Sequence, residues 1–98
     1  MANLDELHDR LKSQLQLLRD SIPALKQDPK PLETFNEFLR EHEFGLALET
    51  VCDFLIETEG LSASESLLDQ IKNLHEQMGV EDECVQNLRK KAVQSKPR

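Results

Sequence analysis

Apolar residues recur at intervals of three and four along most of the chain, which is the spacing of amphipathic helices. In the N-terminal segment the repeating positions are Leu4, Leu7, Leu11, Leu15, Leu18 and Ile22. Pro23 predicts that this helix ends or kinks near residue 21, because a residue before proline avoids helical backbone geometry. A loop over residues 26–31 follows, and a second helix is predicted to start at Pro31. Its inward side carries Leu32, Phe35, Phe38 and Leu39.

Two glycines divide the next part of the chain into helices. A third helix is predicted over residues 43–59, with Gly60 as its terminator. Ser62 and Glu65 then have the S-x-x-E spacing of a capping box, which predicts the start of a fourth helix that ends at Gly79. The inner stripe of this fourth helix is formed by Leu67, Leu68, Ile71, Leu74 and Met78.

A shorter fifth helix is predicted to turn Val85 and Leu88 inward, before the basic segment 89–98 frays. No segment alternates in the way that predicts a strand, and the sequence contains no internal repeat. The length of 98 residues is typical of one domain. The pattern therefore predicts an all-α fold: a single domain over residues 1–98, built as a small bundle of four to five amphipathic helices.

The net charge of −7 is distributed unevenly along the chain. Residues 31–71 hold ten acids and one base, whereas residues 1–30 hold five of each and residues 89–98 hold five bases and no acid. A middle segment this acidic repels phosphates, so direct binding of nucleic acid is not expected. The basic tail leaves two interpretations open. One is contact with RNA, and the favoured one is a cationic end placed near the negative end of a helix.

Glu49, Asp53 and Glu57 form an acidic stripe on the predicted third helix. At about 100° per residue they fall at about 140°, 180° and 220° from Phe44, which lies at the centre of the apolar face. Leu46 falls at about 200°, in the middle of the carboxylates. Like charges four residues apart on a helix cost roughly 0.2–0.5 kcal/mol per pair. No lysine or arginine of this helix balances them.

A second acidic stripe is predicted on the second helix. A solvated face explains one such stripe, but it explains two of the same sign less well, because mixed Glu/Lys pairs would also add stability. Leu46 is either buried against the first or fifth helix or exposed. If it is exposed, it resembles an interface anchor ringed by charges that steer a basic partner. The candidate partner-binding residues are therefore Glu33, Glu37, Glu41, Leu46, Glu49, Asp53 and Glu57.

The sequence motifs of an enzyme or of a cofactor site are absent. The three glycines form neither a G-x-G-x-x-G motif nor a P-loop. His8, His42 and His75 fall on three different helical segments, and neither Cys52 nor Cys84 belongs to a C-x-x-C pair. We therefore expect no enzymatic activity, no cofactor and no metal.

The sequence also predicts where the protein resides. No apolar run is long enough to span a membrane, and the N-terminal residues are acidic and polar where a signal peptide would begin its apolar segment. A cytoplasmic location and no contact with a membrane are therefore expected. Two free thiols at Cys52 and Cys84 are expected as well, because disulfides are rare in that reducing compartment, although the sequence also allows a disulfide between them.

Residues 43–57, EFGLALETVCDFLIE, resemble the central segment of the MafI-type immunity proteins of bacteria, which reads approximately E-x-G-L-A-x-E-x-L-C-D-x-L-x-E. The predicted helix boundaries that follow also fit, so the similarity covers roughly residues 30–80. Val51 stands in place of the family's usual leucine, and Phe54 in place of a polar residue. These two departures bear on the choice of partner.

The resemblance implies a small cytoplasmic bacterial protein that is encoded beside a toxin, including the toxins of contact-dependent growth inhibition. Such a protein binds and neutralises the C-terminal domain of the toxin, which is often a ribonuclease. We therefore expect an immunity protein whose acidic helical face covers a basic nuclease domain, and which acts as a monomer or weak homodimer. Two alternatives stay open. One is a small acidic chaperone for a secreted or assembled protein, and the other is a self-association module that uses Leu46 and the leucines of the first helix.

Overall fold

The computed structural model describes residues 4–61, 63–79 and 83–95. Within these ranges the chain forms helices and no strand, which confirms the predicted all-α fold. The helices are α1 (Leu4–Asp20), α2 (Pro23–Lys26), α3 (Pro29–Arg40), α4 (Phe44–Glu57), α5 (Glu65–Met78) and α6 (Cys84–Ser95). Five of them correspond to the predicted helices, and α2 is a single turn that the hydrophobic pattern did not indicate.

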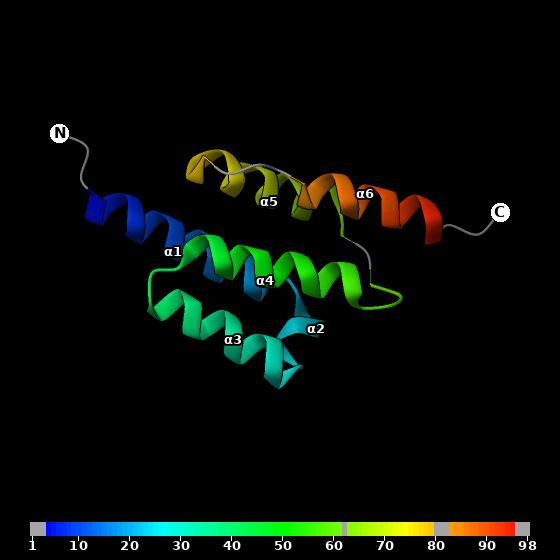
Figure 1. Cartoon of the computed structure of the whole chain (residues 1–98), viewed down its shortest axis with the longest axis horizontal. Coiled ribbons are helices and arrows are strands. Elements are labelled where there is room, and N and C mark those ends of the chain that lie inside the picture. Colours follow the sequence, from blue (N-terminus) through cyan, green and yellow to red (C-terminus); the bar gives the residue numbers. More distant parts are fainter. Residues whose placement is uncertain (1–3, 62, 80–82, 96–98) are drawn as a thin grey trace.

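The central element of the bundle is α4. It contacts α1, α3, α5 and α6, and Figure 1 shows α3 on one side of it and the α5–α6 pair on the other. In the same view α3 and α5 run antiparallel to α4, while α6 lies beside its second half. The bundle is flattened, with extents of 53 × 27 × 17 Å. No helix in the described ranges combines the length and apolar character needed to cross a bilayer.

The core follows from the apolar stripes. Half of the residues in α4 are buried, namely Phe44, Ala47, Leu48, Val51, Cys52, Phe54 and Leu55. The largest side chains that are almost fully enclosed come from five helices: Phe35, Leu15, Leu18, Leu25, Leu48, Leu55, Ile71, Leu74 and Val51. Each large aliphatic side chain buried in this way stabilises the fold by about 1.5–3 kcal/mol. The predicted inward positions of the first helix are therefore confirmed for its central and C-terminal turns.

Prolines set the boundaries between α1 and α3. Ile22, which precedes Pro23, has φ −121° and ψ 86°, so α1 ends close to the predicted position. The helix α3 begins two residues earlier than predicted. Asp28 is extended and Pro29 takes the first helical position, where its missing N–H has no intrahelical partner to lose.

The helix α5 ends where the sequence predicts and has a serine cap at its start. The Ser64 side chain accepts a hydrogen bond from the backbone N–H of Leu67 at 3.1 Å. The capping box predicted from Ser62 concerns a residue outside the described ranges. Gly79 closes the helix with φ 70°, in the left-handed conformation that glycine adopts without steric cost.

The prediction that the basic segment 89–98 frays is wrong for residues 89–95, which belong to α6; residues 96–98 lie outside the described ranges. The ammonium group of Lys91 ties this part of α6 to the C-terminal end of α4 and the turn that follows it, where helix carbonyls lack intrahelical partners. Its Nζ donates hydrogen bonds to the carbonyl oxygens of Leu55 (2.5 Å), Thr58 (2.6 Å) and Leu61 (3.0 Å). One cation of the tail thus lies at the negative end of a helix.

Candidate functional site

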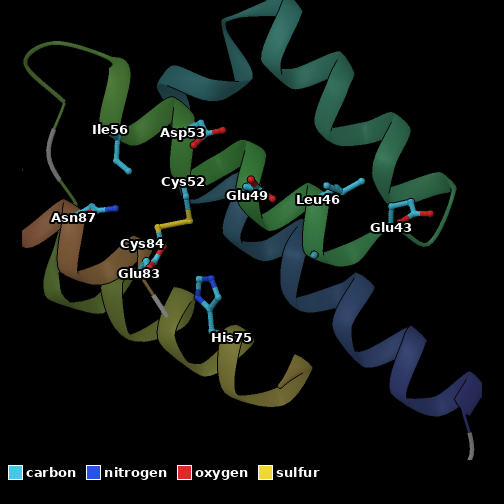
Figure 2. A pocket seen from close by; sticks show the side chains of 11 residues that line it. Glu43, Leu46, Glu49, Cys52, Asp53, Ile56, His75, Glu83, Cys84 and Asn87 are labelled. Carbon is cyan, nitrogen blue, oxygen red and sulfur yellow. A yellow bond between two sulfur atoms is a disulfide. The ribbon is translucent and has the colours of Figure 1, made fainter. Parts of the chain in front are cut away.

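A groove of about 450 Å³ lies between α4 on one side and α5 and α6 on the other (Figure 2). Its α4 wall carries three of the predicted partner-binding residues, Leu46, Glu49 and Asp53. They reach the same groove because they lie on one side of α4, and the apolar side of the helix is buried in the core. Three of the predicted partner-binding residues thus share one wall of this groove.

The groove is acidic on both sides. Four carboxylates line it, and they belong to Glu43, Glu49, Asp53 and Glu83. All four residues are exposed. Glu83 directly precedes α6 and is not among the predicted partner-binding residues. Within the described ranges no lysine or arginine lines the groove, and no ion pair there involves these carboxylates. Their negative potential therefore faces solvent uncompensated and favours cationic groups.

Leu46 is exposed, which decides between the two alternatives left open by the sequence. It is 43% exposed and lines the groove, and Figure 2 shows it on α4 near Glu43 and Glu49. The only other large hydrophobic residue of comparable exposure in the described ranges is Leu17 on α1, at 64%. An exposed leucine among carboxylates gives the groove an apolar contact point beside its charges.

The expectation of two free thiols is wrong. Cys52 in α4 and Cys84 at the start of α6 form a disulfide whose Cα atoms are 5.8 Å apart, and both residues line the groove. Both cysteines are buried, at 4% and 7% exposure. The pairing depends on α6 packing beside α4, and the two residues are separated by 32 positions in the sequence. Helical periodicity alone does not predict such a contact.

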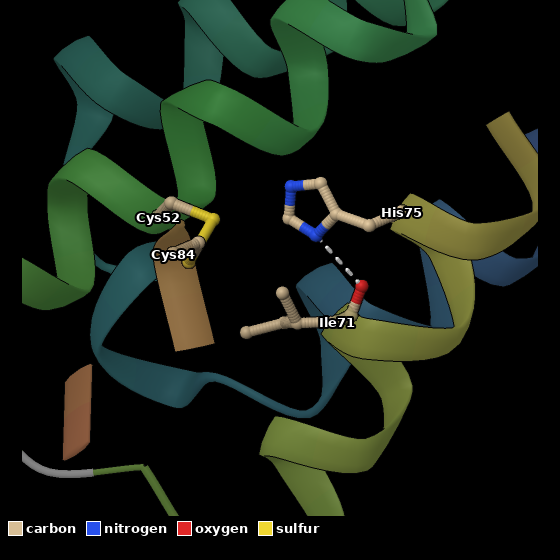
Figure 3. The surroundings of a disulfide bond; sticks show 4 residues. All are labelled: Cys52, Ile71, His75 and Cys84. Atoms are coloured by element: carbon tan, nitrogen blue, oxygen red, sulfur yellow. Dashed lines mark hydrogen bonds between the residues drawn. A yellow bond between two sulfur atoms is a disulfide. The ribbon is translucent and has the colours of Figure 1, made fainter. Parts of the chain in front are cut away.

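His75 is the buried polar residue of the groove. It is 7% exposed, and its ring projects from α5 toward α4 beside the disulfide (Figure 3). Its Nδ1 lies 3.1 Å from the carbonyl oxygen of Ile71, and because a carbonyl oxygen only accepts, the Nδ1–H group donates this hydrogen bond. The sequence contained a signal for this burial, because residue 75 follows Ile71 by four positions on the inner stripe of α5.

The remaining predicted site residues lie elsewhere. Glu33 and Glu37 are exposed on α3, and Glu41 is exposed just after its end. Glu57 is the exposed last residue of α4. None of these four is among the residues that line the groove. The structure therefore unites part of the predicted set on one surface, while the α3 stripe forms a separate charged surface.

Another cluster brings together two histidines from different segments. The ring centroids of His8 and His42 are 5.5 Å apart, and both rings pack against Phe44, at 5.4 and 5.6 Å. His42 has φ 60°, an uncommon left-handed conformation for a residue other than glycine, in the turn before α4. This cluster packs α1 against that turn. Within the described ranges no group of three or more His, Cys, Asp or Glu residues is arranged to hold a metal ion.

Comparison of the chain with protein-family models, with curated proteins and with solved structures finds no match.

Proposed function

We propose that this chain is an immunity protein that binds a cognate bacterial toxin domain, a ribonuclease, and neutralises it through the acidic groove on α4. In this proposal the chain acts in the bacterial cytoplasm, is not itself an enzyme and binds no nucleic acid. The observation that carries the proposal is the groove, which is lined by the carboxylates of Glu43, Glu49, Asp53 and Glu83 and by the exposed side chain of Leu46. The resemblance of residues 43–57 to the immunity proteins supplies the class of partner.

The chemistry of the groove suits a basic protein surface. A ribonuclease holds a polyanion, so the cleft that binds its substrate carries lysine and arginine side chains. Carboxylates on Glu49, Asp53 and Glu83 offer the same negative charge as the phosphates that such a cleft receives. Complementary charge of this kind raises association rates to about 10⁸ M⁻¹s⁻¹ or more at low salt. Rapid capture protects a cell from an enzyme that acts catalytically.

Leu46 adds the contact that charge does not provide. Exposed charge pairs at an interface contribute little affinity on their own, typically about 0–1 kcal/mol each, because water and salt screen them. An apolar side chain that becomes buried near the centre of an interface contributes more, and its charged surroundings exclude water from the contact. In this proposal the carboxylates raise the association rate of the complex, and Leu46 lowers its dissociation rate.

The experiment is to co-express the chain with the C-terminal domain of the large protein encoded next to it, and to measure affinity and RNA cleavage at low and high salt. We compare the native chain with a groove variant that combines Glu49→Gln, Asp53→Asn and Glu83→Gln. The matched control combines Glu33→Gln, Glu37→Gln and Glu41→Gln, which remove the same charge from α3. We expect the groove variant to associate at least tenfold more slowly at low salt, and the α3 variant to change by less than about threefold.

The outcomes separate the possible functions. Binding that weakens with salt and abolishes RNA cleavage supports the proposal. Binding that leaves cleavage intact favours the chaperone alternative, in which an extended segment of the client is held. Equal slowing by both triple variants would mean that overall charge, and not the groove, steers association. Absence of binding at low salt rejects the toxin as partner and leaves the acidic surfaces as solvated faces.

A further inference from the structure

The two walls of the acidic groove come from segments that are joined by one covalent bond. Cys52 belongs to the middle of α4, which carries Glu49 and Asp53, and Cys84 is the first residue of α6. Figure 2 shows the disulfide at the base of the groove, between the α4 wall and Glu83. The position of Glu83 relative to the α4 carboxylates is therefore tied directly to this bond.

The carboxylates near the disulfide repel one another, and this repulsion opposes the packing of α6 against α4 that the disulfide maintains. Glu49 and Asp53 on α4 face the same groove as Glu83, and none of the lysines and arginines that the structure describes lines the space between them. Like charges gathered in one groove repel one another, and this repulsion is strongest at low salt. In the absence of the bond, electrostatics favours movement of the N-terminal end of α6 away from α4.

The other half of α6 is held independently. Lys91 donates hydrogen bonds to the carbonyl of Leu55 in α4 and to those of Thr58 and Leu61 just after this helix, and Arg89 forms an ion pair with Glu65 of α5 at 2.9 Å. Val85 and Leu88 are buried between these two ends. Loss of the disulfide therefore loosens one end of α6, the end that carries Glu83, while the other end stays attached.

We propose that the Cys52–Cys84 bond is a redox latch on the groove. In the reducing cytoplasm such a bond acts as a redox sensor: it forms when conditions become oxidising and then holds the groove in its partner-binding form. Reduction releases the N-terminal end of α6 and leaves the weaker-binding form. The chemistry is thiol–disulfide exchange. A small dithiol donates two electrons and two protons to the pair and becomes a cyclic disulfide, and a low-molecular-weight disulfide reverses the step. Both cysteines line the groove, which gives the reagent its route. The proposal rests on the proposed function for its binding readout.

The first test does not require a partner. Amide hydrogen exchange is measured in the oxidised chain, in the chain reduced with dithiothreitol, and in a variant that combines Cys52→Ala with Cys84→Ala. The reporter is the N–H of Asn87, which donates to the carbonyl of Glu83 at 2.9 Å. We expect its protection to fall at least tenfold on reduction and in the variant, while amides in α3 keep theirs.

Charge variants distinguish the latch from a general loss of stability. Glu83→Gln removes the repelling charge on the α6 side, so it should reduce the loss of Asn87 protection in the reduced chain severalfold. The matched control is Glu37→Gln on α3, which should leave that loss unchanged. Raising the salt concentration should act in the same direction as Glu83→Gln, because it screens the same repulsion.

The second test measures affinity for the toxin domain in both redox forms. We expect the oxidised chain to bind about tenfold more tightly, because the reduced chain must first close the groove. Unchanged Asn87 protection on reduction overturns the latch, and so does lost protection with equal affinity. If neither form binds, the proposed function fails, and lost Asn87 protection would still establish that the bond controls the groove.

Discussion

Leu46 combines exposure with a setting that does not favour an apolar side chain. It is 43% exposed and lies among carboxylates, although leucine is the residue that the chain otherwise uses to fill its core. A single exposed leucine is common on protein surfaces and needs no explanation by itself. Here it lies at the groove that also carries the uncompensated charge, so its removal separates a binding role from a structural one.

Replacement of Leu46 by alanine should change the free energy of unfolding by less than about 0.5 kcal/mol, because the side chain is exposed. Affinity for the toxin domain should fall by about 2 kcal/mol or more, roughly 30-fold, if the leucine is the central anchor. Urea unfolding and calorimetric titration measure the two quantities. Leu17→Ala on α1 removes the other exposed leucine and should affect neither, whereas equal losses of affinity in both variants would contradict an anchor at the groove.

Lys91 is a charged residue with a structural role. Replacement by methionine keeps most of the side-chain volume but removes the ammonium group that serves three carbonyls at the end of α4. We expect unfolding to become easier by about 1.5–3 kcal/mol, the range for hydrogen bonds that involve a charged group. Urea unfolding measures the change. Lys90→Met alters an exposed neighbour and should cost less than about 0.5 kcal/mol, and a similar cost for both variants would reject the capping role.

Among the elements, two glycines near helix ends should respond to alanine in opposite directions. A Cβ at Gly45, in the first turn of α4, would meet no atom within 4 Å, and the backbone there is not left-handed. Gly79 has φ 70° after α5, a conformation that strains an L-residue. We expect Gly45→Ala to stabilise by about 0.4–1 kcal/mol and Gly79→Ala to destabilise by about 1 kcal/mol. Thermal unfolding compares them, and a shift of the same sign in both would contradict the assignment of these backbone states.

The elements also show what sequence can and cannot predict. Long periodic segments such as those around Leu15 and Ile71 indicated helices correctly, because burial of an apolar stripe governs both the pattern and the structure. The single-turn helix α2 was not predicted, because four residues are too few to show a helical repeat of apolar positions. The length of α6, which continues through Ser95, was not predicted either. Lys91 in α6 contacts carbonyls that lie 30 to 36 positions earlier, and a local pattern carries no information about such contacts.

The candidate site also contains some residues that the sequence predicted and others that it did not. Glu49 and Asp53 were identified because their spacing places them on one side of α4. Glu83 was not among the predicted residues, and the Cys52–Cys84 bond was allowed but not favoured, because both depend on how α6 packs against α4. Helical spacing thus predicts which residues share a wall, and only tertiary packing shows which walls face each other.

For the whole molecule, shape and charge act together. The Cα radius of gyration is 13.6 Å, somewhat above the value of about 12.6 Å expected for a compact domain of this length. The difference reflects a bundle only 17 Å deep along its shortest axis. In a bundle this thin, the central helix α4 both contributes to the core and presents its outer side to solvent. This arrangement explains how one helix supplies seven buried residues and a charged groove wall.

Self-association through Leu46 is the remaining alternative at this scale, and salt dependence distinguishes it from binding of a basic partner. A stable dimer buries about 800 Å² on each partner, so a contact centred on Leu46 would bring two acidic grooves together. We expect light scattering to give the monomer mass of 11.3 kDa at low salt, because the grooves repel each other. Any weak dimer should strengthen as salt screens that repulsion, the opposite of the dependence expected for the toxin complex. A dimer that forms at low salt and dissociates with Leu46→Ala would instead assign the leucine to self-association.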